Sequence, residues 1–412
     1  MNQHDVSQTR LYEWLTGDED SRMCKLADEL SSARLVLPWL MGIIGAPVWM
    51  VGLLVPIREA GALLPQVFVA GFIRLRPKRK WVWVAGALIQ ALAAVALSVL
   101  ALTASGSIGG ACVLAALTLL SLARGLSSIA TKDVLGKTIA KRRRGTLMGW
   151  SGSLAGGATL LAGGVLMLFD GQPGNIVVAT LLAIAAVSWL INALSAARIV
   201  ETPGAVEGGE NSWDSIKLGL SLLRSDRTFL FFNLTRALLL SSALALPYIA
   251  LLGQNQSGTD LSGLGIMIVI SGLAAMVASP VWGKRADKSS RGVMRDAATG
   301  TAICCFLAAS LVWFPGTWTQ SIWPYAVVYA LLVIVHHGVR LGRKTYLVDM
   351  ASQDNRALYV ALSNTLTGIL MLIVGGLIGA LAQWFGSDIL LLVLSIIAIG
   401  AILCTRLLPE VE

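Results

Sequence analysis

Two stretches of the chain, SGSLAGGATLLAGG at 151–164 and SNTLTGILMLIVGG at 363–376, align with each other at an offset of 212 residues. Other glycine and basic positions pair at the same offset. They are Gly71 with Gly283, Arg79 with Arg291, Lys132 with Lys344, Arg144 with Arg356, and Gly156 with Gly368. A unit of about 200 residues is far longer than a solenoid repeat. The chain is therefore predicted to be a duplication of two large units.

The composition places this duplicated unit in a membrane. Hydrophobic residues make up 56% of the 412 residues and charged residues only 13%, which is too little polar surface for a soluble domain. Backbone in lipid must satisfy its hydrogen bonds within each segment, so long apolar runs are helices. Hydropathy marks ten such runs directly: 81–104, 109–131, 145–169, 176–198, 228–252, 261–283, 297–315, 323–345, 356–385 and 388–408.

The repeat corrects the hydropathy profile near the start of the chain. Hydropathy alone marks 35–57 as the first span, and too few apolar residues follow it to make a second. In the second half, the helix at 261–283 leads straight into a basic loop, so its counterpart should occupy about 49–71. The turn before it then falls at Gly42–Pro47, and the first helix covers 25–44. The prediction is an all-α membrane protein of twelve helices, arranged as two parallel six-helix repeats.

This arrangement divides the chain into five parts. They are a cytoplasmic N-terminal segment at 1–24, an N-terminal bundle at 25–198, a cytoplasmic linker with an amphipathic helix at 199–227, a C-terminal bundle at 228–408, and a cytoplasmic tail at 409–412. Arg58 and Glu59 lie inside the membrane in this register, which makes them candidates for function because charge at that depth is costly.

The net charge of +9 is concentrated in alternate loops. RLRPKRK at 74–80 and KRADKSSR at 284–291 are strongly basic, whereas the loops at 105–110 and 253–260 contain no Lys or Arg. By the positive-inside rule, we expect a multi-pass protein of the cell (inner) membrane with both termini in the cytoplasm. The basic face would attract anionic lipid, so the charge does not call for a nucleic-acid partner.

The sequence lacks the patterns that mark enzymes and metalloproteins. Its five cysteines show no metal-ligand spacing, and no nucleophile–base set or nucleotide-binding loop is evident. We expect neither enzyme activity, nor a cofactor, nor a bound metal.

The loop after 261–283 carries a spacing that resembles a known family. Gly283, Asp287, Lys288 and Arg291 fit G-x-x-x-D-[RK]-x-x-R between two apolar helices. This loop, together with the six-plus-six duplication and the polar linker, resembles the major facilitator superfamily. The resemblance implies a solute transporter whose two six-helix domains rock about a central cavity. It also implies that the acidic loop residue helps to hold the cytoplasmic side closed.

The first copy of this loop departs from the family pattern. It keeps Gly71 and Arg79 but has Leu75 where the acidic residue should stand. We therefore expect a one-sided gate at Asp287, with Arg291 and Arg356 as its partners. The alternative is a solvated basic turn that only obeys topology.

The strongest candidate for substrate or coupling chemistry is LLVPIREAGALLPQ at 53–66. Counting back from Gly71 places Glu59 about 18 Å into the membrane, with Gln66 on the same helical face. Arg58 lies about 100° away, so the two charges should have different partners. An unpaired carboxylate at that depth favours its neutral form, which suits a proton carrier. The alternative is a structural ion pair.

Other polar side chains at membrane depth are weaker candidates. They are Arg124, Asn233, Arg236, His336, His337 and Arg340. Arg236 either snorkels to the surface or binds an anionic group. A buried histidine held by a neighbouring helix is as common as a functional one. Asp28 and Glu29 lie near the cytoplasmic end, where we expect them to be solvated.

These features favour a secondary transporter that moves a small solute by alternating access, with proton coupling as an extension. The cationic groups mildly favour an anionic or amphipathic solute. The alternative is a transporter-like membrane protein that acts as a sensor or assembly factor without transport. We expect a monomer in contact with membrane lipid.

Overall fold

The computed structural model describes residues 23–64, 76–138, 157, 160–164, 174–201, 226–257, 261–351 and 356–411. All regular structure within these residues is helical, with no strand, which confirms the all-α prediction. Nine helices in the described part are long and apolar enough to cross a membrane. The predicted spans at 145–169 and the linker at 199–227 lie largely outside the described residues.

The helices of the first half begin with a short one at 23–30. It is followed by α2 (Val36–Ile43), α3 (Val48–Leu63), α5 (Lys80–Thr103), α6 (Gly106–Thr138) and α8 (Gly174–Arg198). The second half contains α10 (Arg227–Leu238), α11 (Ser241–Ser257), α12 (Leu261–Ala286), α13 (Ser290–Trp313), the short 3-10 helix η1 (Thr317–Gln320), α14 (Ile322–Met350), α15 (Arg356–Phe385) and α16 (Ser387–Arg406).

The turn that the repeat predicts at Gly42–Pro47 is present. Helix α2 ends at Ile43, and α3 begins at Val48 after Gly45, whose φ of +69° favours glycine. A single span over 35–57, as hydropathy alone suggests, is therefore wrong. Glycine's freedom in the left-handed region permits a tight reversal that the apolar residues on both sides conceal from a hydropathy average.

Two predicted helices are broken, which the sequence analysis did not anticipate. The span at 25–44 is interrupted at 31–35, and the span at 228–252 is interrupted at Leu239–Leu240. Pro38 explains the first break, because its ring would clash with the carbonyl of Arg34 in a continuous helix. That freed carbonyl accepts a hydrogen bond from the Tyr329 hydroxyl at 3.3 Å.

The second break has a different local cause. The hydroxyls of Ser241 and Ser242 each donate to a backbone carbonyl three residues earlier, those of Leu238 and Leu239, at 2.9 Å. Serine side chains that bond the neighbouring backbone compete with the helical ladder. Each break falls in the first span of its half, although the two breaks do not coincide at the 212-residue offset.

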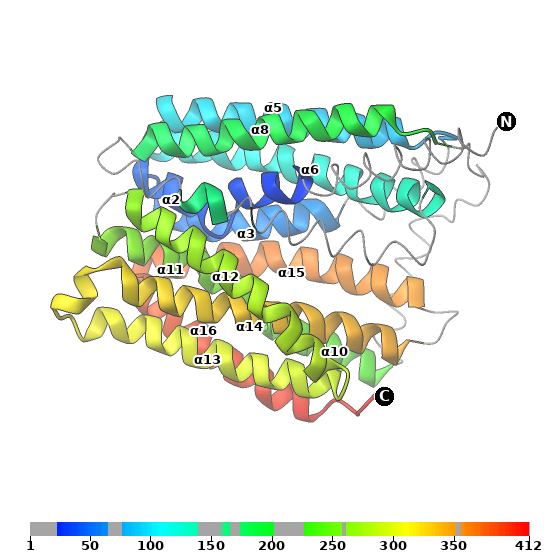
Figure 1. Ribbon diagram of the computed structural model, residues 1–412. Coiled ribbons are helices and arrows are strands. Elements are labelled where there is room, and N and C mark those ends of the chain that lie inside the picture. The colour runs from blue at the N-terminus through cyan, green and yellow to red at the C-terminus, as the bar shows by residue number, and fades with distance from the viewer. Residues whose placement is uncertain are drawn as a thin grey trace.

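The two halves occupy separate parts of the bundle. In Figure 1, α5, α6 and α8 lie together in the upper part, and α13, α14 and α16 lie in the lower part. Helices α3 and α15 pack against each other across the boundary, and α11 packs against α2 and α3. The basic loop between α12 and α13 and the C-terminus lie at the right-hand end of Figure 1, called here the basic end.

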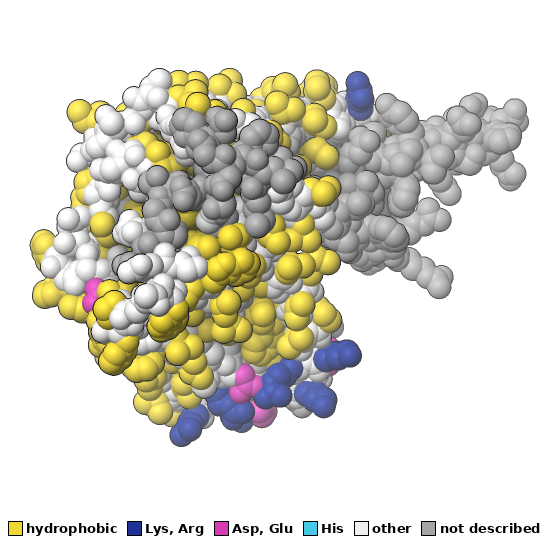
Figure 2. Space-filling model, turned by 60° about the vertical axis from the view of Figure 1, so that its left-hand side comes forward, with side chains coloured by type: hydrophobic (Ala, Val, Ile, Leu, Met, Phe, Trp, Pro, Cys, Tyr) yellow, Lys and Arg dark blue, Asp and Glu magenta, His cyan; other side chains and the backbone are white. Residues whose placement is uncertain are grey.

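The outer surface is mostly apolar, as a lipid-facing surface requires. Figure 2 shows hydrophobic side chains over most of the visible face, with Lys and Arg gathered at one lower edge. Three tryptophans near helix ends, Trp81, Trp318 and Trp323, are more than half exposed, as side chains at a membrane–water interface would be. Trp83 is the exception, since it is only 3% exposed and its indole donates to Asn192 at 3.2 Å.

Candidate solute-binding site

Charged side chains of the first half form a paired network inside the bundle. Asp28, on the helix at 23–30, accepts hydrogen bonds from Arg58 of α3 and from Arg124 of α6, the latter at 2.5 Å. Glu59, next to Arg58, pairs with Arg34 at 2.6 Å. All five side chains are half-buried. Each arginine of this network therefore has a carboxylate partner.

This network decides several sequence predictions. Arg58 and Glu59 have different partners, as their angular separation indicated. Glu59 is paired, so the argument from an unpaired carboxylate does not apply to this conformation. The expectation that Asp28 is merely solvated is wrong, because Arg58 and Arg124 reach it from two other helices. Gln66 lies outside the described residues.

Helix α14 presents a second set of ionisable side chains. His336, Arg340 and Arg343 are four and three residues apart, so they share one helical face. His336 is buried, and its Nδ1 lies 3.0 Å from the Ser242 hydroxyl of α11. Arg340 is exposed and Arg343 is half-buried, as is His337. Neither arginine forms a hydrogen bond or ion pair with any other described residue.

Arg236 of α10 is buried among neutral partners. Its guanidinium donates to the Ser363 hydroxyl at 2.6 Å and to the Asn364 side-chain oxygen at 2.8 Å. Ser363 in turn donates to the side-chain oxygen of Asn233 at 2.7 Å. Arg236 therefore points into the protein and does not snorkel to the surface.

The two sets of charges lie close to each other. Arg340 and Arg343 of α14 are within electrostatic reach of Glu59 in the opposite half. Arg236 is within reach of both Arg343 and Glu59. The structure thus brings candidates from helices far apart in the sequence into one polar region, which we call the central cluster. It consists of Asp28, Glu29, Arg34, Arg58, Glu59, Arg124, Arg236, His336, His337, Arg340 and Arg343.

Sequence reasoning missed two members of the cluster and misplaced one. Arg34 and Arg343 were not among the candidates, and Asp28 was expected to be solvated; Glu29, which is exposed, agrees with that expectation. Arg343 lies within the predicted span 323–345 and within α14, which continues to Met350. The signals were present, since Arg343 follows Arg340 by three residues and Arg34 precedes Pro38 by four.

The breaks in the first and seventh spans adjoin the central cluster. Arg34 lies within the break at 31–35, and the break at Leu239–Leu240 lies between Arg236 and Ser242. In transporter folds, substrate sites are typically formed by interrupted helices at the interface of the two repeats. The breaks and the charges therefore point to the same region.

The end of the bundle opposite the basic end is closed by contacts between the halves. Gln254 of α11 donates to the Trp39 carbonyl of α2 at 3.0 Å, and both side chains are buried. A Cβ on Gly379 of α15 would lie 2.5 Å from the Trp49 carbonyl oxygen of α3. The absence of a side chain at this glycine therefore permits close packing of the two helices.

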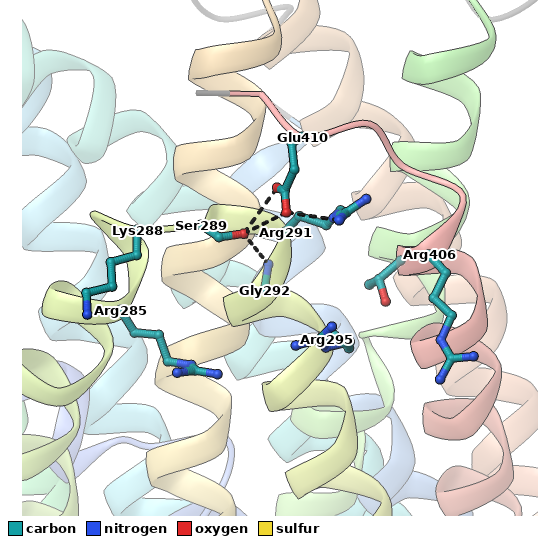
Figure 3. Close-up of a pocket in the computed structure, with 9 residues that line it drawn as sticks. Arg285, Lys288, Ser289, Arg291, Gly292, Arg295, Arg406 and Glu410 are labelled. Atoms are coloured by element: carbon teal, nitrogen blue, oxygen red, sulfur yellow. Dashed lines mark hydrogen bonds and ion pairs between the residues drawn. The ribbon is translucent and has the colours of Figure 1, made fainter.

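The family-like loop lies at the basic end (Figure 3). Arg291 of α13 donates to the Leu408 carbonyl at 2.8 Å and pairs with Glu410 at 2.9 Å. Ser289 also donates to Glu410, at 3.1 Å. The carboxylate of Asp287 is exposed and contacts no other described residue through a hydrogen bond or ion pair. In this conformation, Arg291 thus binds the C-terminal segment and forms no pair with Asp287.

A separate pocket of about 330 Å³ adjoins this loop. Figure 3 shows that its lining side chains come from the adjoining ends of α12, α13 and α16. They are Arg285, Lys288, Ser289, Arg291, Gly292, Arg295, Thr405, Arg406 and Glu410. The structure places the remaining gate candidates only in part. Arg79 immediately precedes α5, and Gly283 lies near the end of α12. The side chain of Arg356 and the whole of Gly71 lie outside what the structure describes.

The sequence profile of the Major Facilitator Superfamily matches residues 30–342 and 237–412, which together span most of the chain. The chain belongs to the major facilitator superfamily. Members of this superfamily are transporters rather than enzymes. A comparison with curated protein sequences gives no match. Within the described residues, no group of three or more His, Cys, Asp or Glu side chains is placed to hold a metal ion.

Solved structures of superfamily transporters share the fold. A mutant of the nucleoside transporter NupG has a TM-score of 0.74 at 13% identity, covering 96% of this chain and 99% of that chain. A POT family transporter in complex with a thioalcohol-conjugated peptide has a TM-score of 0.70 at 12% identity, covering 96% and 94%. A D-xylose–proton symporter has a TM-score of 0.66 at 13% identity, covering 99% of both chains.

Proposed function

We propose that this protein is a secondary transporter that moves a small solute through the central cluster by alternating access. The observation that carries the proposal is the placement of charged residues from both halves beside two broken helices. Charge at membrane depth is costly and is retained where a polar pathway needs it. A sensor or assembly factor without transport would have no need of such a pathway, so that function is the second choice.

The same proposal assigns a conformation. The halves meet at the end where Gln254 contacts Trp39, whereas Arg340 in the central cluster is exposed. Access to the cluster would then come from the basic end. With that end in the cytoplasm, as the positive-inside rule indicates, the molecule is inward-facing. The bundles at 25–198 and 228–408 are the proposed moving bodies, both termini are cytoplasmic, and the protein works as a monomer in the inner membrane.

Glu59 is our proposed proton-coupling residue. It has one ion-pair partner, Arg34, and its side chain is 33% exposed, whereas Asp28 is shared between two arginines. Protonation of Glu59 would release Arg34, which lies in the break of the first span. A proton could therefore change the charge facing the solute and the conformation of the broken helix together.

The test begins with a thermal-shift screen of the purified protein against solute libraries at two pH values, because a bound ligand raises thermal stability by mass action. Proteoliposomes then measure uptake of a stabilising solute with and without a proton gradient. Glu59→Gln should abolish gradient-driven accumulation and preserve solute exchange. The matched control is Glu410→Gln. It removes a carboxylate that is also ion-paired but is exposed and far from the cluster. Driven uptake unchanged by Glu59→Gln would refute the coupling role.

The loop residue Asp287 remains our candidate for the gate. Its carboxylate is exposed here, and a closed cytoplasmic side would give it a partner on the opposite half. Asp287→Asn should then increase labelling of a cysteine placed in the cluster by a membrane-impermeant reagent added from the cytoplasmic side. An unaltered labelling rate would count against the gate.

A further inference from the structure

The charges of the central cluster do not balance. Six arginines face three carboxylates among the described residues. Asp28 is already shared by two of the arginines, and Glu59 is paired with a third. Glu29 is exposed and forms no side-chain hydrogen bond with a described residue. Even if its charge is counted, a positive excess remains.

This excess belongs to the second half. Among the described residues, the side chain of Arg236 is hydrogen-bonded only to the neutral Ser363 and Asn364. Arg340 and Arg343 lie three residues apart on one face of α14, where like charges repel each other. Neither has a hydrogen-bonding partner among the described residues. Arg236 is buried and Arg343 is half-buried, and a cation that lacks a counter-charge away from bulk water is unfavourable. This arrangement is therefore suited to a state in which a negative group is bound.

We propose that the transported solute is an anion whose carboxylate or phosphate group binds between Arg340 and Arg343, with Arg34 facing it from the opposite half. This substrate class rests on the transport function proposed above. Guanidinium groups present paired N–H donors that match the oxygens of carboxylate and phosphate. An anion bound here would replace the repulsion within α14 by two attractions and would attract Arg34 across the boundary between the halves.

Ligand binding by the purified full chain in neutral-lipid nanodiscs tests this assignment. The probes are inorganic phosphate, glucose 6-phosphate and succinate, each at the same ionic strength, with glucose and succinamide as neutral matches and putrescine as a cation. We expect at least one anion to bind, and its affinity to fall about tenfold or more in Arg340→Gln and in Arg343→Gln, because each loses a charge-assisted hydrogen bond. The control variant is Arg406→Gln, which removes an exposed arginine of the separate pocket. This variant should bind the anion with the affinity of the wild type.

The outcomes separate the two proposals. Phosphate binding alone identifies an inorganic anion, and preference for glucose 6-phosphate or succinate identifies an organic one; both support the assignment. Binding limited to glucose, succinamide or putrescine, no binding of any anion, or anion binding retained in an Arg340→Gln/Arg343→Gln double variant overturns it. Exchange of a neutral solute in proteoliposomes would then leave the transport function standing. Failure of the folded protein to exchange any solute that it binds would instead refute transport itself.

Discussion

The two halves of the molecule share a scaffold but treat buried charge differently. In the first half, every arginine of the central cluster is paired with a carboxylate. In the second half, none is paired with a carboxylate of a residue that the structure describes. The charged positions of one half have uncharged residues at the corresponding positions of the other half. At the 212-residue offset, Arg58 and Glu59 correspond to Ile270 and Ser271, and Arg340 and Arg343 correspond to Ser128 and Thr131.

The difference indicates that the charges of the two halves have different roles, one in stability and the other in ligand binding. Paired charges largely neutralise each other, so the first-half network stabilises the packing of the helix at 23–30 against α3 and α6. Unpaired charges contribute little to folding and remain available to a ligand. Removing a charge should therefore destabilise the first half and have little effect, or the opposite effect, in the second.

The largest expected effect comes from Asp28→Asn. This change leaves Arg58 and Arg124 without their shared counter-charge while both remain half-buried. Breaking a buried ion pair from one side costs about 3–5 kcal/mol, and we expect on the order of 3 kcal/mol here because the groups are only partly buried. Thermal unfolding of the purified protein in detergent measures the loss as a lower Tm.

Glu29→Gln is the matched control for Asp28→Asn. It removes a carboxylate from the neighbouring position, but that carboxylate is exposed and forms no hydrogen bond or ion pair with a described side chain. Its Tm should stay close to that of the wild type. Adding Arg124→Gln to Asp28→Asn should recover part of the lost stability, because it removes one of the uncompensated cations. Equal Tm values for Asp28→Asn and Glu29→Gln would contradict a structural role for the network.

The sequence predicts one side of this comparison better than the other. Arg58 and Glu59 could be placed at depth because the repeat fixed the turn before α3, and their angular separation correctly indicated different partners. Asp28 could not be assigned, because its role depends on how α3 and α6 pack against the first span. Arg343 was not selected, because a basic residue near the end of the predicted span 323–345 already satisfies the positive-inside rule, whereas α14 continues to Met350.

A smaller loss is expected from Ser363→Ala in the second half. Arg236 would keep Asn364 but lose its shorter hydrogen bond, and Asn233 would lose a donor. A hydrogen bond to a charged group contributes about 1.5–3 kcal/mol, so Tm should fall by less than for Asp28→Asn. The control is Ser395→Ala, since the buried Ser395 hydroxyl donates to a neutral acceptor, the Ala302 carbonyl, at 2.8 Å. Equal losses in the two variants would mean that the hydrogen bond from the charged Arg236 to Ser363 stabilises the fold no more than a hydrogen bond between neutral groups.

Arg343→Gln should have almost no effect on stability, or a slightly opposite one. In the protein without ligand, the substitution removes the repulsion between Arg343 and Arg340, a gain of about 0.2–0.5 kcal/mol for neighbours on one helical face, and it also removes the attraction of Arg343 to Glu59, which offsets part of that gain. The Tm should therefore rise slightly or stay constant. A clear fall in Tm would show that Arg343 has a stabilising partner, and the contrast between the halves would then be wrong.

The smallest effect is expected from Glu410→Gln at the basic end, where a charged pair lies outside the membrane region. Arg291 and Glu410 are 32% and 49% exposed, and pairs in such surroundings contribute about 0–1 kcal/mol. Arg291 also keeps its bond to the Leu408 carbonyl in this variant. Any loss should shrink further at high salt, because exposed pairs are screened, whereas the loss from Asp28→Asn should persist. Tm measurements at low and high salt distinguish the two cases. A salt-insensitive loss for Glu410→Gln as large as that for Asp28→Asn would mean that burial does not decide which charges stabilise this fold.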